Sequence, residues 1–439
     1  MGSFNLKRMA KVTAMLVILA AVVAGSKFGY NYLVVNGPLI TEARHLDARL
    51  EQAKKVGLAV STADVETEER KKAIALHEPF LAFDTFLVNY RDIVDDERNP
   101  ERLINLLADN PGQLQNLIAA SEMPNVDTPI DWEGGLATSP PSYVSYNRYV
   151  AVACTLARYN ADRNNFGETA KYLNVAAKLT RHLVDEPSTA AVISWTSCAN
   201  RILRTSLGVI ESAPKNAKLL ADVRDVVDLV QPPTSLATAI KGDCLLFLVT
   251  ARNFESMGPD KQRALQLSDE NKSINPPEGR FAGKALESKS LNYWISSMEF
   301  ASPKDGNVKN AGYVIDELGA QWVLEDSPAN YLAGALPMTY EQMGTSIMRV
   351  SQIKSLVMSA ASVIAKWQQS GSLPSELSND DPFSLDPMTG RPFMYKPGPG
   401  RFVLQAIGDK EPAKAQPPIG NLRMVQDQGY GLTLKLASS

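Results

Sequence analysis

Apolar side chains recur at intervals of three and four residues along most of this chain, which is the spacing of one face of an α-helix. Short runs rich in proline, glycine and polar residues separate the segments that have this pattern. The segments with helical spacing are residues 39–56, 66–94, 99–108, 112–121, 143–162, 166–186, 189–212, 215–230, 234–256, 282–300, 308–323 and 342–370. The pattern therefore predicts a mainly α fold, a multi-helix body arranged as an array of helical hairpins.

The first 35 residues have a different pattern, in which basic residues precede an apolar run. Lys7, Arg8 and Lys11 stand before residues 12–25, whose sequence is VTAMLVILAAVVAG. A basic flank stays on the cytoplasmic side while the apolar segment enters the bilayer, so the rest of the chain is expected outside the cytoplasm. Residues 1–36 are therefore predicted to be a cytoplasmic stub and one N-terminal transmembrane helix, a signal-anchor in the cytoplasmic membrane.

Two interpretations of this segment differ in whether it is retained. A spanning helix needs about 20 apolar residues. The segment reaches that length only by passing Lys27 and continuing through aromatic and aliphatic residues to Val35. The small residues at 22–26 also suit a signal peptidase, and cleavage there would leave a periplasmic protein. The apolar continuation to Val35 favours the anchor.

Residues 39–56 carry one apolar stripe on an otherwise charged helix. The stripe consists of Leu39, Ala43, Leu46, Leu50 and Ala53. A helix with a single apolar face buries it against one surface. We expect this helix either to rise from the membrane as a stalk or to pack on the body, and it opens an N-terminal helical segment over residues 37–138.

The helical-array body is expected to span residues 139–370. Its helices at 143–162 and 166–186 are joined by Arg163-Asn164-Asn165 and alternate small with large apolar residues. Small residues let two helices approach closely. The pair resembles a tetratricopeptide-type hairpin, although no second copy occurs at a fixed period.

The last helix of the body, at 342–370, has the most regular pattern. Its a/d stripe consists of Val350, Ile353, Val357, Ala360, Ile364 and Trp367. A stripe of this kind faces a core or forms the seam of a homodimer. We favour the core and keep the homodimer as the alternative.

The pattern changes over residues 371–439, where Gly, Pro, Asp and Ser separate short runs with strand spacing. One hairpin is predicted around Pro397-Gly398-Pro399-Gly400 and a second within residues 421–436. Because an isolated hairpin is only marginally stable in water, this antiparallel β module is expected to dock on the preceding helix, with Phe393 and Tyr395 facing Trp367. Asp386-Pro387 and Thr389-Gly390 predict a turn in which the aspartate bonds its own backbone.

An ordered set of residues in the tail resembles a known family. The set is Gly371-Ser372-Leu373-Pro374-Ser375-Glu376-Leu377, Asp386-Pro387-Met388-Thr389-Gly390-Arg391-Pro392-Phe393-Met394-Tyr395, Arg401-Phe402-Val403-Leu404 and Ile407-Gly408-Asp409. It resembles the C-terminal module of type II secretion pseudopilins. The same motif recurs in membrane-anchored helical proteins of bacteria, especially of planctomycete-like lineages. The resemblance covers the tail alone and implies a part in a secretion or pseudopilus-like system.

The chain departs from pseudopilins at both ends. A pseudopilin carries a glutamate near the start of its apolar helix, directly after a prepilin-peptidase site, and residues 1–11 contain no glutamate. Major pseudopilins also have a calcium loop near the end. Here Lys410 separates Asp409 from Glu411, and calcium needs six to eight oxygen ligands. Neither pilin-like processing nor a calcium ion is expected.

Composition narrows the range of functions further. A net charge of −3 over 439 residues gives no electrostatic case for nucleic acid as a partner. Three cysteines do not make a disulfide scaffold. Cys154, Cys198 and Cys244 all lie in apolar helical contexts and are predicted to be buried thiols. The alternative, in an oxidising compartment, is a bond between Cys154 and Cys198 on neighbouring helices.

The candidate catalytic and metal-binding residues are few. His45, His77 and His182 have no metal-ligand spacing. His45 is expected on the exposed side of its helix, His77 at a helix end, and His182 near a helix C-terminus, where a cation is favourable. Ser351 and Lys354 have the S-x-x-K spacing of penicillin-binding enzymes without the partner motifs, which indicates coincidence. We therefore predict no catalytic residues, no metal and no cofactor.

These observations favour a non-enzymatic, membrane-anchored extracytoplasmic interaction or scaffold protein, because helical arrays bind partners along their surfaces. Its partners are expected to be proteins, with the membrane held through the N-terminal helix. The first alternative is an accessory component of a type II secretion or pseudopilus-like system. The second is a hydrolase with an unfamiliar site.

Overall fold

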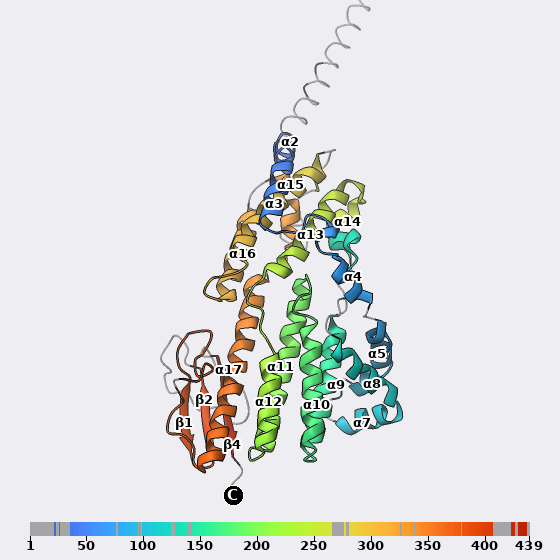
Figure 1. The fold of residues 1–439 in the computed structure, drawn as a ribbon. Coiled ribbons are helices and arrows are strands. Elements are labelled where there is room, and N and C mark those ends of the chain that lie inside the picture. The colour runs from blue at the N-terminus through green and yellow to red at the C-terminus, as the bar shows by residue number, and fades with distance from the viewer. Residues whose placement is uncertain are drawn as a thin grey trace, which may run out of the picture.

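The computed structural model describes Val22, Ser26 and residues 36–75, 78–94, 96, 99–123, 128–138, 143–265, 276–277, 281–324, 327–336, 339–378, 380–406, 423–425 and 429–436. Helices make up most of these residues, and a small antiparallel sheet lies beside the C-terminal half of the last helix (Figure 1). The predicted mainly α fold with a small β module is confirmed. The predicted transmembrane segment, His77 and the acidic residues 409–411 lie outside the described residues.

The first helices pack on the body. The predicted helix at 39–56 is two helices, α2 (Gly37–Ala43) and α3 (Leu46–Lys55), and both lie against α15 (Ala282–Phe300). Leu39, Leu46 and Ala53 are buried there. The stalk interpretation is wrong for these residues, because their stripe is covered by the body.

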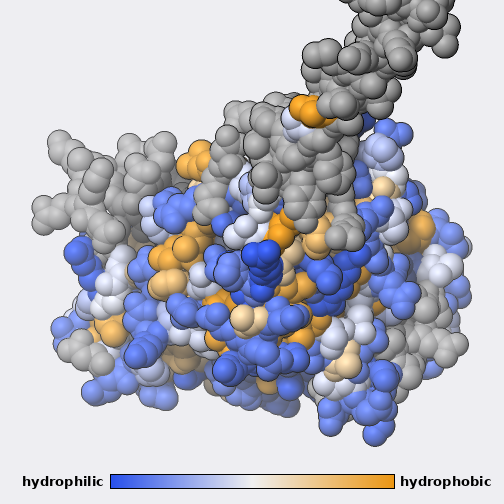
Figure 2. All heavy atoms as spheres, turned by 90° about the horizontal axis from the view of Figure 1, so that it is seen from above, coloured by the Kyte–Doolittle hydropathy of each residue, from blue (hydrophilic) through white to orange (hydrophobic). Residues whose placement is uncertain are grey.

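A polar contact fixes this packing. The guanidinium of Arg49 in α3 donates hydrogen bonds to the carbonyl and the hydroxyl of Ser288 in α15, at 2.9 and 3.0 Å, and pairs with Glu42 of α2. Seen from this end, the described surface is mainly hydrophilic with smaller hydrophobic areas (Figure 2).

Short helices follow. They are α4 (Glu68–Ala75), α5 (Glu78–Asn89), α6 (Arg91–Val94), α7 (Pro100–Asp109) and α8 (Pro111–Glu122), with 3₁₀ turns η2 (Thr62–Asp64) and η3 (Trp132–Ala137). The predicted helix at 66–94 is thus three helices. A buried ion pair joins this region to the body: Arg70 Nη2 lies 2.9 Å from Glu186 Oε2 and donates to the carbonyl of Thr128 at the same distance.

The centre of the molecule is the hairpin of α9 (Val144–Ala161) and α10 (Phe166–Arg181), as predicted. Asn164 makes the turn with a φ of +58°, a conformation that asparagine tolerates better than most residues. The long α11 (Thr189–Ser212) packs on α9, and α12 (Ala217–Leu229) packs on α10. Small side chains such as Ala157 and Ala176 are fully buried between these helices.

The remaining helical elements are α13 (Ala237–Asn253), η4 (Phe254–Ser256), α14 (Pro259–Ala264), α16 (Val308–Leu324), η6 (Pro328–Ala335) and α17 (Tyr340–Ser370). Helices α16 and α17 approach closely at two glycines. A Cβ on Gly312 would lie 2.1 Å from the carbonyl oxygen of Tyr340, and one on Gly344 would lie 2.3 Å from that of Val308. Only glycine permits this packing.

Helix α17 is the axis of the fold. The a/d stripe is fully buried from Val350 to Ile364, and residues on its other faces, such as Leu356 and Val363, are buried as well. Trp367 is only partly buried. The stripe therefore faces the core, and the homodimer seam is wrong for this helix.

The tail forms one sheet with strand order β1-β2-β4-β3. Strands β1 (Met394–Gly398) and β2 (Arg401–Gln405) form the first predicted hairpin, and β3 (Arg423–Val425) and β4 (Gly429–Lys435) form the second. Strands β2 and β4 pair antiparallel and pack on α17. Their inward residues, Phe402, Leu404, Leu432 and Leu434, are at most 1% exposed. The predicted docking of the module on the helix is confirmed.

Among the described residues, one helical stretch, Pro328–Ser370, is long and apolar enough to cross a bilayer. Its apolar window is 78% buried inside the protein, as expected for a core helix.

Candidate functional site

The most conspicuous motif of the chain, Asp386-Pro387-Met388-Thr389-Gly390, serves the fold. Asp386 is 1% exposed, and its Oδ1 accepts hydrogen bonds of 2.9 Å from the Met388 amide and from Gln352 Nε2 of α17. Its Oδ2 accepts a bond from the hydroxyl of Thr389, and Gly390 closes the turn with a φ of +69°. The predicted turn is confirmed.

The sequence did not reveal the partner of this turn. Gln352 is 1% exposed and lies between residues of the a/d stripe, so it joins the motif to the centre of α17. Ser359 Oγ of α17 also donates to the carbonyl of Phe383 in the tail at 2.6 Å, and within the tail Tyr395 Oη donates to the carbonyl of Pro374 at 3.0 Å. The contacts of Asp386 and Phe383 with α17 attach the tail to this helix.

The other predicted polar candidates also have structural partners. Ser351 Oγ donates to the carbonyl of Ile347, and Lys354 Nζ donates to the carbonyl of Asp228, at 3.1 Å in each case. Burial lowers the pKa of Lys354, which the Asp228 carboxylate partly offsets. Ser351 and Lys354, which have the S-x-x-K spacing, therefore make separate contacts.

The described histidines differ in environment. His45 is exposed, as expected. His182 caps the C-terminus of α10, but it is 6% exposed, and its Nε2 lies 3.0 Å from the carbonyl oxygen of Met123. Burial lowers its pKa, so the expectation of a favourable cation is wrong there: desolvation outweighs the helix dipole.

All three cysteines are buried and free, as predicted. Cys198 donates a hydrogen bond of 3.3 Å to Asn147 Oδ1, and burial raises the pKa of its thiol, as does the nearby Cys154. The alternative, a disulfide bond between Cys154 and Cys198, is wrong for this structure, in which both thiols are free.

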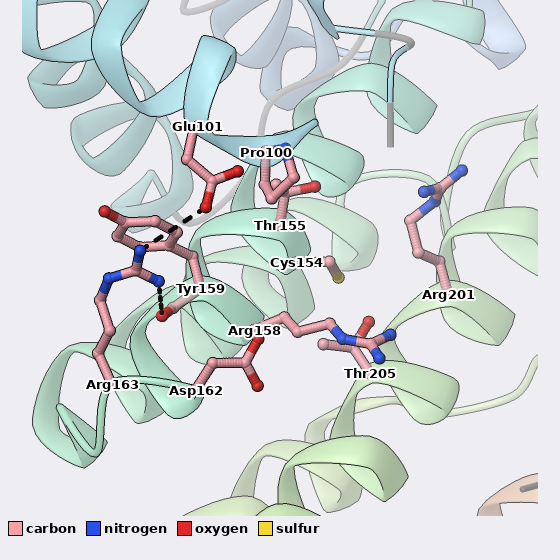
Figure 3. A pocket seen from close by; sticks show the side chains of 10 residues that line it. All are labelled: Pro100, Glu101, Cys154, Thr155, Arg158, Tyr159, Asp162, Arg163, Arg201 and Thr205. Carbon is pink, nitrogen blue, oxygen red and sulfur yellow. Dashed lines mark hydrogen bonds and ion pairs between the residues drawn. The ribbon is translucent and has the colours of Figure 1, made fainter. Parts of the chain in front are cut away.

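A polar groove of about 390 Å³ lies where α7, α9 and α11 meet (Figure 3). We call it the arginine groove. Its lining residues are Pro100 and Glu101 of α7, Cys154, Thr155, Arg158, Tyr159 and the following Asp162 and Arg163 of the α9 end, and Arg201 and Thr205 of α11. No charged motif in the sequence marks this place, because its residues come from three separate segments.

One side of the arginine groove is built by an internal cluster. The guanidinium of Arg163 lies 3.5 Å from the centre of the Tyr159 ring, and its Nη2 is 3.7 Å from Glu101 Oε1. Stacking and an ion pair thus hold Arg163 against α7.

The centre of the arginine groove is open. Arg158 is exposed and extends from α9 toward α11, the helix that carries Arg201 and Thr205 (Figure 3). Within the described residues, no hydrogen bond or ion pair joins the guanidinium of Arg158 to the protein. The arrangement supplies hydrogen-bond donors to a ligand and suits binding.

The described residues contain no group of three or more histidine, cysteine or acidic side chains arranged to hold a metal ion. Comparison of the chain with protein-family models, curated proteins and solved structures finds no match. The functional argument therefore rests on the fold and on the arginine groove.

Proposed function

We propose that this protein is a non-enzymatic, membrane-anchored extracytoplasmic interaction protein whose partner binds in the arginine groove. The observation that carries the proposal is an open hollow, lined by hydrogen-bond donors, on the surface of a helical array. Helical arrays commonly use such surfaces to hold other proteins.

The proposed location rests on the N-terminal pattern. Lys7, Arg8 and Lys11 precede the apolar run, and α2 begins at Gly37, directly after the proposed transmembrane helix. The packing of α2 on α15 would then hold that end of the body next to the membrane, with the β module at the far end.

Two measurements on the protein from native membranes test this location. A topology reporter fused after Ser439 should be active outside the cytoplasm, and the intact mass should include residues 1–36. A mature N-terminus between Gly25 and Lys27 would contradict the anchor and leave a periplasmic protein.

A second candidate is an accessory component of a type II secretion or pseudopilus-like system. It is supported by the order of a long helix, a buried Asp386 turn and an antiparallel sheet, which is the order that the resemblance implies. Co-purification from native membranes separates the two: secretion components favour this candidate, and unrelated envelope proteins favour the first.

A further inference from the structure

We propose that the arginine groove binds an extended segment of the partner protein that carries one acidic and one basic side chain two residues apart. The inference rests on the proposed interaction function and names the chemistry of the segment that the groove recognises.

The charged lining of the groove is balanced in sign. A second hollow of about 210 Å³ shares Arg158 and Asp162 with the arginine groove and continues along α11 to Ser212. Together the two hollows are lined by three arginines and three carboxylates: Glu101, Arg158, Asp162, Arg163, Arg201 and Glu211. A lining without net charge favours neither an acidic nor a basic ligand, but it complements a ligand that carries both charges.

Contacts within the protein already occupy four of these six groups. Arg163 Nη2 lies 3.7 Å from Glu101 Oε1, and Arg201 and Glu211 each have an interaction of their own. These four side chains shape the groove, and the proposal does not need them to be free.

Arg158 and Asp162 are the two charged groups that remain. Both are exposed, and within the described residues neither side chain makes a hydrogen bond or an ion pair. Figure 3 shows the guanidinium of Arg158 extending toward Thr205 of α11, while the carboxylate of Asp162 stays on the α9 side. The groove therefore offers a ligand one guanidinium and one carboxylate, side by side.

The spacing of these two groups matches an extended polypeptide. Arg158 and Asp162 are four residues apart at the end of α9, which places their Cβ atoms about 5–6 Å apart. In an extended chain, the side chains of residues i and i+2 point to the same side and lie about 6–7 Å apart. An acidic residue can thus meet the fork of Arg158 while a basic residue two positions away meets Asp162.

Free hydroxyl groups in the groove suit the backbone of such a segment. Four other threonines within helices bond the carbonyl four residues earlier: Thr169, Thr180, Thr196 and Thr250. Thr155 and Thr205 make no such bond to the described residues, and both line the arginine groove. Because a hydroxyl both donates and accepts, it can bond either the N–H or the C=O of a peptide group.

The test measures binding of dye-labelled peptides to the full-length protein in detergent by fluorescence anisotropy. The probe is dye-(Gly-Glu-Gly-Lys)₃-amide, in which acidic and basic side chains alternate two residues apart. Three peptides of the same length serve as controls: dye-(Gly-Glu)₆-amide, dye-(Gly-Lys)₆-amide and dye-(Gly-Gln)₆-amide.

Two variants each remove one charge from the groove, Arg158→Gln and Asp162→Asn. Their matched controls are Arg204→Gln and Asp185→Asn, because Arg204 and Asp185 are exposed residues outside the linings of both hollows.

We expect the alternating peptide to bind more tightly than each control peptide. Each groove variant should weaken its binding by about five-fold, the effect of losing one favourable ion pair, and the control variants should stay within about two-fold. Arg158→Gln should remove the advantage over the lysine peptide, and Asp162→Asn the advantage over the glutamate peptide.

Absence of saturable binding of the alternating peptide would overturn the proposal. Equal or tighter binding of the glutamate or the lysine peptide to the unaltered protein would also overturn it, and so would equal weakening by Arg204→Gln or Asp185→Asn.

The proposed function is tested separately by co-purification with Arg158→Gln. If this variant loses partners that the unaltered protein retains while the alternating peptide fails to bind, the interaction function stands and the mixed-charge segment is wrong. If both proteins retain the same partners, the interaction function stands and the assignment of the arginine groove fails.

Discussion

The junction between α17 and the β module and the arginine groove use polar side chains in opposite ways. At the junction, Asp386 and Gln352 are both 1% exposed and bond each other. In the arginine groove, Arg158 is exposed, and Thr155 donates to none of the described residues. Polar groups satisfied inside the protein specify its structure, whereas polar groups left facing a hollow are available to a partner.

The comparison also shows that a conspicuous sequence motif and a candidate binding site can lie in different parts of the protein. The junction carries the conspicuous Asp386-Pro387-Met388-Thr389-Gly390 motif, and the side chains of Asp386 and Thr389 make internal hydrogen bonds. The arginine groove has no motif, because Glu101, Arg158 and Arg201 are brought together only by folding.

The largest effect is expected from removing residues 371–439. Truncation after Ser370 uncovers the face of α17 that packs on Phe402 and Leu432. Burial of one such aromatic contributes about 3–5 kcal/mol, so loss of the whole module should cost more than any single substitution. Thermal unfolding should shift to markedly lower temperature; an unchanged transition would show that the module is an independent appendage.

The second-largest effect on the free energy of unfolding is expected from Gln352→Ala. The substitution leaves the buried Asp386 carboxylate without one of its donors, which costs about 3 kcal/mol. The matched control is Gln342→Ala, an exposed position of the same helix, with a change within about 0.5 kcal/mol. Equal effects of the two substitutions in urea unfolding would mean that the junction contributes no specific stability.

The carboxyl of Asp243 is a third polar group with hydrogen-bond partners inside the protein, and it can be tested through the pH dependence of stability. Asp243 is partly buried and accepts hydrogen bonds from Thr189 and Tyr340, and desolvation raises its pKa. A carboxyl with a raised folded-state pKa stabilises most below its unfolded value of about 3.9, and this stability is lost as pH rises through the folded-state value.

The variant Asp243→Asn removes this titration. The stability of the wild type relative to the variant should therefore fall as pH rises from 4 to 8, measured by urea unfolding of both proteins at each pH. Groups that titrate equally in both proteins cancel in the difference. A flat or rising difference would contradict the assignment.

The smallest effect on stability is expected in the arginine groove. Arg158→Gln removes an exposed side chain whose guanidinium bonds none of the described residues, so the free energy of unfolding should change by no more than about 0.5 kcal/mol. A loss of several kcal/mol in chemical unfolding would show that Arg158 serves the fold, as the junction residues do.

Much of the fold is predictable from local pattern. The helix at 189–212 is found at those residues, and both hairpins and the Asp386 turn lie where the spacing places them. These features depend on periodicity and on turn chemistry, which short stretches of sequence contain.

Features that depend on tertiary packing were not predictable in the same way. The apolar stripe at 39–56 continues across Arg44 and His45, where the structure ends one helix and begins another. The hydrogen bond of His182 is made with Met123, 59 residues away, and the arginine groove is formed by three helices. No local pattern records such contacts.

One paired measurement tests most directly the claim that the junction is structural and the arginine groove binds. The amount of partner protein that co-purifies from native membranes and the unfolding temperature are measured for Arg158→Gln and for Gln352→Ala, with co-purification done at a temperature where both are folded. We expect a crossed result: Arg158→Gln loses the partner protein and keeps its unfolding temperature, whereas Gln352→Ala keeps the partner protein and unfolds at lower temperature. Loss of the partner protein by Gln352→Ala, or its retention by Arg158→Gln, would contradict the account.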